Sequence, residues 1–206
     1  ASTLAPEWNF LRTPREEFWS LSARPGYLRL KLRPERLSDR ANPSFVGRRQ
    51  QHMRFSARAA VEFKSEHAHE CAGLVILQNN EYHFRFVICG GTTPTVRLER
   101  RATPNPNPQL LPILTGTEAL LAELPVEGER FYLKVEADGQ AYSFYIANEL
   151  EAWRPLAEGV DGRLLSTSYA GGFVGAYLGM YASSNGQSSA NTADFDWFEY
   201  TGLDEC

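Results

Sequence analysis

Apolar and polar residues alternate with a period of two along most of this chain. In "FSARAAVEF" (residues 55–63) every odd-numbered residue is apolar, and in "GYLRLKLRP" Leu28, Leu30 and Leu32 alternate with basic residues. "YHFRFVI" (residues 82–88) repeats the pattern with large aromatic side chains. Successive side chains of a β-strand point to opposite faces of the sheet. The alternation therefore predicts strands that each bury one face.

The clearest local prediction is a β-hairpin in "RFYLKVEADGQAYSFYI" (residues 130–146). Two alternating segments flank Asp138-Gly139, a dipeptide that accepts the positive φ angles of a two-residue hairpin turn. Only "GTEALLAEL" (residues 116–124) favours a short helical turn. Further strands are predicted at "AGLVILQ", "TVRLER", "GAYLGMYA" and "DFDWFEY".

Turn-rich segments such as "TPNPNPQ" and "SSNGQSSAN" separate the predicted strands. About ten short strands with turn signals every ~8–12 residues are typical of an antiparallel sandwich or barrel. The chain shows no βαβ rhythm and no internal repeat, and its 206 residues fit a single β domain. We therefore predict an all-β, two-sheet antiparallel jelly-roll sandwich.

Charge and hydropathy exclude two classes of partner. The net charge of −4 argues against nucleic acid, because proteins that bind it usually carry a strongly basic face. No apolar stretch approaches the ~20 residues that span a bilayer, so we expect no membrane partner. The first residues, "ASTLAPEWNF", lack the features of a signal peptide. We predict that residues 1–7 are a linker from a missing upstream domain and that residues 8–206 form a single domain.

The chain has three cysteines, an odd number that does not suggest a disulfide framework. Cys71 and Cys89 lie in apolar runs and are expected to be small core residues. This usage favours a reducing compartment, so we expect a cytoplasmic rather than a secreted location.

A run of five polar or cationic residues interrupts the alternation in "NPSFVGRRQQHMRF" (residues 42–55). We predict that residues 45–55 form one strand, in which this run places polar groups on both faces of the sheet. Such a strand suits the wall of a groove that binds sugar hydroxyls or carboxylates, and the alternative is a solvated outer face. The sequence does not decide which face lines the groove. The candidate groove residues are Arg48, Arg49, Gln50, Gln51 and His52.

Other motifs give weaker support for a function. In "SEHAHE" (residues 65–70), His67 and His69 have the spacing of two ligands on one strand face, but no third histidine or paired cysteine follows nearby. The segment is better interpreted as a polar turn. Nucleotide-binding and nucleophile-elbow motifs are absent, and no motif selects a pair of catalytic carboxylates.

Several segments resemble, in order, the C-terminal concanavalin A-like domain of family 43 glycoside hydrolases. These enzymes are β-xylosidases and α-arabinofuranosidases, and the resemblance extends over almost the whole chain. It implies a concanavalin A-like sandwich without catalytic residues, because a β-propeller earlier in the same polypeptide carries the catalytic carboxylates in that family. The matching segments are "WNFLRTP" (8–14), "WSLSARPGYLRL" (19–30), "PSFVGRRQQHMRFSARAAVEF" (43–63), "ECAGLVILQNNEYHF" (70–84) and "ADFDWFEY" (193–200).

The resemblance also implies roles for two residues. Phe173, in "GGFVGAYLGMYAS", matches an aromatic residue that lines the substrate pocket of the propeller and contacts a xylo-oligosaccharide. Asp196, in "DFDWFEY", matches a position near a structural Ca²⁺ of concanavalin-like sandwiches, and oxygen ligands suit calcium. A parent enzyme that forms a homo-oligomer is a further implication.

Three functions remain open from the sequence. The first is a non-catalytic accessory domain that packs on the propeller and helps to close its pocket. The second is a stand-alone carbohydrate-binding module for xylan or a related glycan. The third is an independent sugar-active enzyme.

Overall fold

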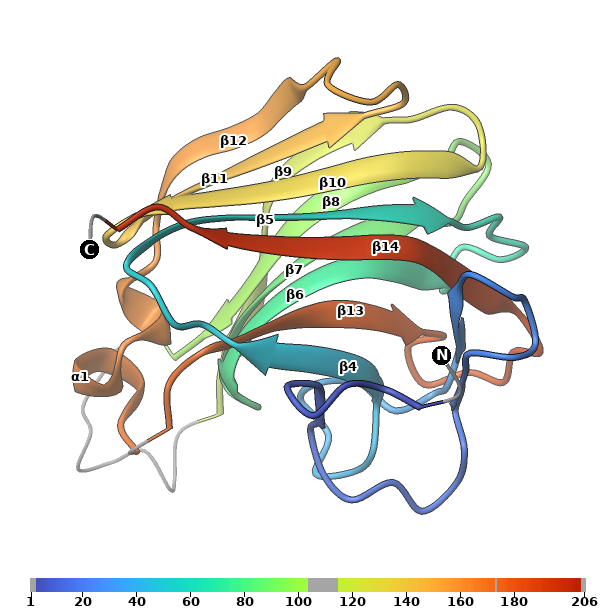
Figure 1. The fold of residues 1–206 in the computed structure, drawn as a ribbon, viewed down its shortest axis with the longest axis horizontal. Helices are drawn as coiled ribbons and strands as arrows, with labels where there is room; N and C mark the ends of the chain where they lie inside the picture. Colours follow the sequence, from blue (N-terminus) through green and yellow to red (C-terminus); the bar gives the residue numbers. More distant parts are fainter. Residues whose placement is uncertain (1–2, 104–114, 173, 205–206) are drawn as a thin grey trace.

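The computed structural model describes residues 3–103, 115–172 and 174–204, and their strands form two seven-stranded sheets packed face to face (Figure 1). The first, the β6 sheet, contains in spatial order β1 (Asn9–Phe10), β4 (Ser44–Arg49), β13 (Tyr177–Ser183), β6 (Cys71–Asn79), β7 (Tyr82–Cys89), β8 (Thr95–Ala102) and β9 (Thr117–Pro125). The second, the β5 sheet, contains β12 (Arg154–Asp161), β11 (Ala141–Ala147), β10 (Arg130–Asp138), β5 (Arg54–Glu62), β14 (Thr192–Gly202), β3 (Leu28–Lys31) and β2 (Trp19–Ser20).

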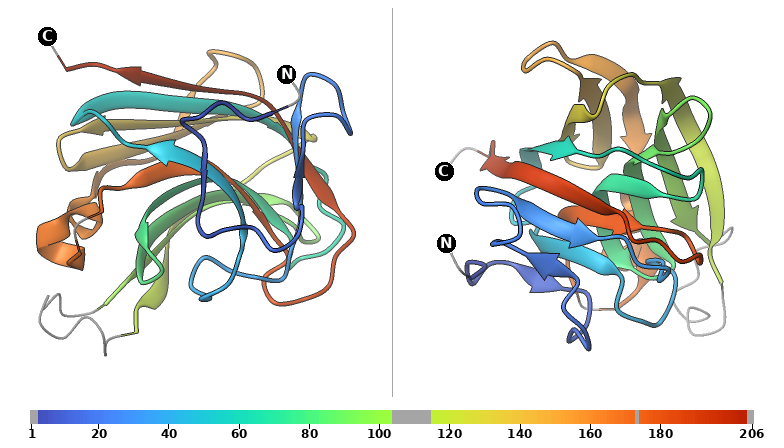
Figure 2. Two further views of the ribbon diagram at one scale, coloured as in Figure 1. Left: turned by 60° about the horizontal axis from the view of Figure 1, so that its bottom comes forward. Right: turned by 90° about the vertical axis from the view of Figure 1, so that its right-hand side faces the viewer.

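The neighbouring strands that are paired within each sheet run antiparallel. Figure 2 shows the two layers one above the other. The helices of the described residues are a 3₁₀ turn, η1 (Arg163–Leu165), and a single turn, α1 (Thr167–Ala170). Neither is long enough to cross a membrane, and no other described segment is such a helix. The predicted all-β, two-sheet antiparallel sandwich is confirmed.

The main core lies between the sheets and is built from the inward-facing positions of the alternating strands. Phe55, Ala57, Ala59 and Val61 of β5 are fully buried, as their alternation predicted. Phe84 and Phe86 of β7 and the leucines of β3 belong to the same core. Burial of each large apolar side chain stabilises the fold by about 1.5–3 kcal/mol.

A second apolar cluster covers the opposite, outer face of the β6 sheet. Leu37, from the segment between β3 and β4, packs there against the outward side chains of the sheet. The ring of Phe45 lies over Gly47 and Gly179, which are register partners, and a Cβ on either glycine would collide with that ring. The sheet is therefore buried on both faces in this region. The cluster comprises Leu37, Phe45, Cys71, Val75, Leu77, Val87, Cys89 and Tyr181.

The hairpin prediction is confirmed, with a turn one residue later than expected. Asp138 pairs with Ala141, so the two turn residues are Gly139 and Gln140. Gly139 has φ +62°, which suits the first central position of a tight hairpin turn. The alternation fixed the two strands, and the glycine fixed the point of reversal.

The helical turn predicted at residues 116–124 is wrong, because this segment forms the edge strand β9 (Thr117–Pro125). β9 pairs with β8, and a bulge at Leu121 lies between the pairs that join Leu98 to Ala122 and Glu99 to Leu120. The extra residue breaks the two-residue period, which explains why the pattern resembled helical spacing.

The continuous strand predicted over residues 45–55 is also wrong. β4 ends at Arg49 and β5 begins at Arg54, and these strands belong to different sheets. Residues 50–53 carry the chain from one layer to the other at the left-hand end of Figure 1. The question of which strand face lines a groove therefore does not arise, since the polar run includes a crossover between sheets.

Candidate functional site

The crossover residues line a pocket at one end of the sandwich. Its volume is about 260 Å³. The walls come from the crossover, the β10–β11 hairpin, the segment before α1 and the residues that lead into β13. The lining residues are Gln50, Gln51, His52, Met53, Gly139, Gln140, Tyr142, Gly162, Leu165, Ser166, Gly175 and Ala176.

Gln50 ties three parts of this end together. Its backbone N–H donates to Ala176 O at 2.9 Å, and its Nε2 donates to His52 O at 3.0 Å. The Tyr142 hydroxyl donates to Gln50 Oε1 at 3.0 Å. Burial raises the pKa of Tyr142 to about 12, so this hydroxyl is a proton donor at neutral pH. Gln50 therefore forms the framework of the pocket, and both ends of its amide are engaged.

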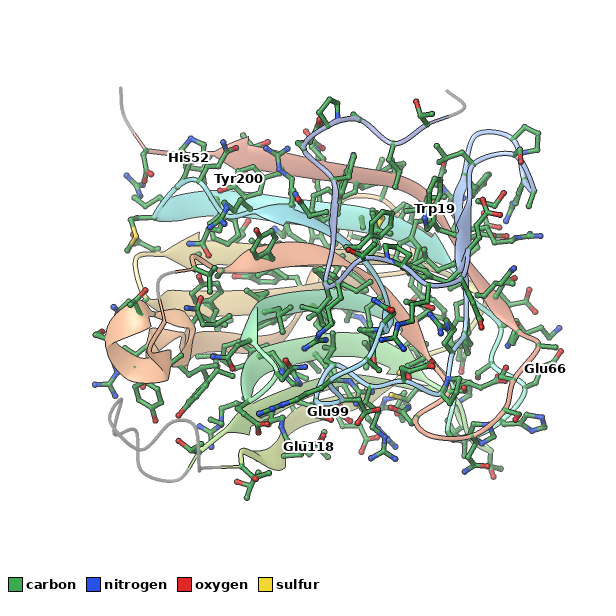
Figure 3. The ribbon with its side chains drawn as sticks, turned by 90° about the horizontal axis from the view of Figure 1, so that it is seen from below. Trp19, His52, Glu66, Glu99, Glu118 and Tyr200 are labelled. Atoms are coloured by element: carbon green, nitrogen blue, oxygen red, sulfur yellow. The ribbon has the colours of Figure 1, made fainter. Side chains whose placement is uncertain are left out.

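Tyr200 of β14 anchors the other half of the crossover. Its hydroxyl accepts hydrogen bonds from the backbone N–H groups of Gln51 and His52, each at 3.1 Å. The same oxygen lies 3.2 Å from His52 Nδ1 (Figure 3). The His52 ring covers Gly202, where a Cβ would lie 2.5 Å from the ring. One phenol thus fixes two peptide groups and one imidazole.

The two arginines of the predicted set lie outside the pocket lining. Arg48 packs over the Tyr200 ring at 4.8 Å and donates to Gln51 Oε1 at 2.8 Å. Arg49 is exposed and lies over the Tyr177 ring at 4.9 Å. The structure therefore brings Gln50, Gln51 and His52 together at the pocket, whereas the arginines lie beside it, with Arg48 bonded to Gln51 from outside the lining.

Sequence reasoning did not select Tyr142 and Tyr200 as partners of the crossover. Tyr200 lies 148 residues from His52 along the chain, so no local spacing links them. The alternating pattern around Tyr142 and Tyr200 predicted that both lie in strands, β11 and β14. Their contact with the crossover depends on the topology of the whole sandwich.

The segment that precedes β13 is held at this same end. Gln78 of β6 is only 4% exposed, and its Nε2 donates to Val174 O at 2.6 Å. Phe173, predicted to line the substrate pocket, lies outside the described residues. Gly175 lines the pocket of the crossover.

The chemistry of this pocket is that of hydroxyl, amide and imidazole groups. The described residues of its lining include no carboxylate. Glycoside hydrolysis generally uses two carboxylates about 5–10 Å apart across the scissile bond. This lining suits contact with neutral polar groups, such as sugar hydroxyls or backbone amides, rather than acid–base catalysis.

Asp196, the predicted calcium ligand, has a cationic partner. Its Oδ2 lies 2.5 Å from Arg130 Nη2, and Arg130 Nη1 lies 2.5 Å from Glu62 Oε1. A guanidinium at this distance repels a divalent cation and occupies one of the two carboxylate oxygens of Asp196. The residues at this position do not fit a Ca²⁺ site, and calcium binding itself stays an untested prediction.

The loop between β5 and β6 holds a second group of titratable residues, at the opposite end of the molecule from His52 (Figure 3). Ligand atoms of Glu66, His67 and Glu70 lie within 4.8 Å of one another. Glu70 is 1% exposed and accepts hydrogen bonds from the backbone N–H groups of Glu66 and His67. Ser189 and Asn191 also donate to it. Glu70 is therefore a structural carboxylate that closes the polar turn.

The comparisons identify the family. A family model described as the β-xylosidase C-terminal concanavalin A-like domain matches residues 1–201. This chain belongs to that family. The resemblance predicted from the sequence is confirmed.

Curated relatives of this C-terminal domain are longer proteins. The chain is 36% identical over 203 residues to a non-reducing end α-L-arabinofuranosidase of Bacteroides ovatus, an alignment that covers 98% of the chain and 36% of that protein. It is also 36% identical to a xylosidase/arabinosidase of Butyrivibrio fibrisolvens, over 89% of the chain and 33% of that protein. The chain thus spans about a third of the length of these relatives.

Solved structures of longer proteins contain the same fold, and this chain again covers only about a third of their length. A Bacteroides ovatus xyloglucan PUL GH43B structure superposes with a TM-score of 0.84 at 31% identity, over 98% of this chain and 38% of that one. The GH43 protein BlXynB of Bacillus licheniformis superposes with a TM-score of 0.87 at 26% identity, over the same shares.

Replacement of Tyr200 by phenylalanine tests the anchor of the crossover. The change removes the acceptor of two backbone N–H groups, so we expect a loss of about 1–2 kcal/mol in the free energy of unfolding. Chemical denaturation measures it. The matched control is Tyr145→Phe, because the Tyr145 hydroxyl donates to the exposed side chain of Glu158 and accepts from no crossover residue among those described. Equal effects of the two variants would contradict the anchoring role.

Replacement of Glu70 by glutamine tests the buried carboxylate through pH. Burial raises the pKa of Glu70, but hydrogen bonds from Ser189, Asn191 and two backbone N–H groups outweigh it and hold the pKa below its usual range. A lowered folded-state pKa contributes stability that is present above the unfolded pKa and is lost as pH falls through the folded value. We therefore expect Glu70→Gln to cost about 1.5–3 kcal/mol at pH 7.

The difference between the wild type and Glu70→Gln should shrink as pH falls below about 4. Denaturant unfolding at a series of pH values measures both curves. Glu66→Gln, on the exposed part of the same loop, is the control and should follow the wild type. Parallel curves for the wild type and Glu70→Gln across the acid range would show that the ionised carboxylate contributes nothing.

Proposed function

We propose that this chain is a non-catalytic accessory domain of a β-xylosidase-type glycoside hydrolase. In this proposal it packs on a catalytic β-propeller of the same polypeptide and helps to close the pocket that holds a xylo-oligosaccharide. The supporting observation is that one domain model matches residues 1–201, while the chain spans about a third of the length of each relative. The remaining two thirds of those relatives is long enough to contain a catalytic domain.

The end of the sandwich that carries the crossover pocket is the part proposed to meet the propeller. The described residues of its lining offer amide, hydroxyl and imidazole groups for hydrogen bonds and include no Asp, Glu, Lys or Arg. Gln78 fixes the backbone at Val174, next to Phe173 in the sequence. Because the backbone of Val174 is held in place, this contact supports a role in positioning the neighbouring residue, Phe173, toward the propeller. The capping role of Phe173 stays a prediction from the family resemblance.

The test of the cap uses the longest natural polypeptide that contains these residues. Phe173→Ala should lower kcat/KM for nitrophenyl xyloside or arabinofuranoside by roughly threefold to tenfold, because one stacking contact is lost. Val174→Ala is the control, since the Val174 side chain is 46% exposed and its backbone contact remains. Unchanged kinetics for Phe173→Ala would contradict the proposed role of Phe173 in closing the pocket.

Assays of the isolated chain distinguish the accessory role from the two alternatives. We expect no turnover of nitrophenyl glycosides and no heat of binding with xylobiose, xylohexaose or arabinoxylan at millimolar concentration. Turnover would establish an independent enzyme, and measurable binding would establish a carbohydrate-binding module.

A further inference from the structure

Two cysteines lie directly opposite each other at one end of the β6–β7 pair. Cys71 is the first residue of β6, Cys89 is the last residue of β7, and the register pairs them. The backbone N–H of Gly90 donates to Glu70 O at 2.9 Å. This bond joins the residue after Cys89 to the residue before Cys71, which is the pattern that brackets a non-hydrogen-bonded pair.

The geometry of such a pair suits a covalent bond between the side chains. Opposed residues in a non-hydrogen-bonded pair have Cα atoms about 4.5 Å apart, and their side chains lie closer than in the hydrogen-bonded pair. Disulfides span Cα separations of about 4.4–6.8 Å. Cys71 and Cys89 also share one face, since both belong to the outer apolar cluster. Both thiols are free in this structure.

The surroundings of the two sulfur atoms differ. Arg85 Nη2 donates to Cys71 Sγ at 3.1 Å, and Asn185 Nδ2 lies 3.4 Å from the same atom. A guanidinium and an amide N–H therefore both lie within hydrogen-bonding distance of the Cys71 sulfur. Burial, and then the charge of Cys71, raise the pKa of Cys89. Cys71 is therefore the attacking thiol and Cys89 the resolving thiol.

We propose that Cys71 and Cys89 are a cross-strand dithiol that small-molecule disulfides, such as glutathione disulfide, oxidise to an intramolecular disulfide. In the first step the Cys71 thiolate attacks one sulfur of the reagent, forms a mixed disulfide and releases one thiolate. In the second step Cys89 loses its proton and attacks the Cys71 sulfur, which releases the second reagent thiol. The two protein thiols are oxidised, and one reagent disulfide is reduced to two thiols.

The location of the pair at the strand ends gives the reagent a route to buried sulfur atoms. Cys71 is 0% exposed and Cys89 is 4% exposed. The pair occupies the last register position of β6 and β7, where Ser183 of β13 and Thr95 of β8 flank it. Strand ends open at lower free-energy cost than strand centres, so access at this position does not require the whole sheet to unfold. The turn after Asn79 closes one end of the β6–β7 hairpin, and the disulfide would close the other.

The experiment uses the full chain with Cys206→Ser, which leaves these two thiols. The reduced protein is incubated in its native state with glutathione disulfide, and a second sample is refolded from denaturant in a glutathione redox buffer. We expect the intact mass to fall by two hydrogens, and a digest to yield a peptide that joins Cys71 to Cys89. The apparent Tm should rise on the order of 5–10 °C on oxidation.

Single variants test the assigned order of the two thiols. In the same background Cys89→Ala should accumulate a stable mixed disulfide at Cys71, whereas Cys71→Ala should react at least about tenfold more slowly. Equal rates would overturn the assignment of Cys71 as the attacking thiol. The denatured protein is the control for reagent activity. If its thiols react while neither native nor refolded samples yield the cross-link, the proposed dithiol is wrong.

Discussion

Contacts between aromatic side chains of facing strands join the two layers of this sandwich. Phe144 of β11 lies 5.5 Å from Phe86 and 5.8 Å from Phe84 of β7, between ring centroids. Tyr142 continues this row and meets Phe84 of β7 at 6.4 Å. Such pairs add about 0.5–1.5 kcal/mol each beyond the burial of their area. The row ends at Tyr142, whose hydroxyl binds the crossover, so the core and the pocket share one side chain.

Alternation predicted the strands that have one face in the core and one in solvent, and β3, β5, β10 and β11 follow it closely. It failed at residues 50–53, because apolar ends and polar centres look the same in a strand and in a crossover between sheets. It failed again at β9, where a bulge shifts the period. The pocket could not be predicted, since Tyr142 and Tyr200 reach the crossover only through the topology of the sheets.

The centre of the β6 sheet departs from simple alternation because both of its faces are buried. The sequence places His83 and Arg85 on the polar face of β7, yet they are 2% and 7% exposed. Burial lowers the pKa of His83 to about 3, with Arg85 adding repulsion, so the imidazole is neutral in the fold. Arg85 keeps its charge beside Glu99, with 3.4 Å between Nε and Oε2. Segments remote in sequence supply this cover, which a local pattern cannot reveal.

Burial of both faces makes the register of β6 and β7 unusually sensitive. A slip of one residue exchanges the two faces of a strand, which would drive Arg85 into the phenylalanine core and place Phe84 and Phe86 on the outer face. A charge without a partner in that core is far more costly than the ion pair with Glu99. The buried guanidinium therefore acts against misregister. The same register places Cys71 opposite Cys89. The proposed disulfide therefore depends on the burial of both faces of the sheet, which sets the pairing of β6 with β7.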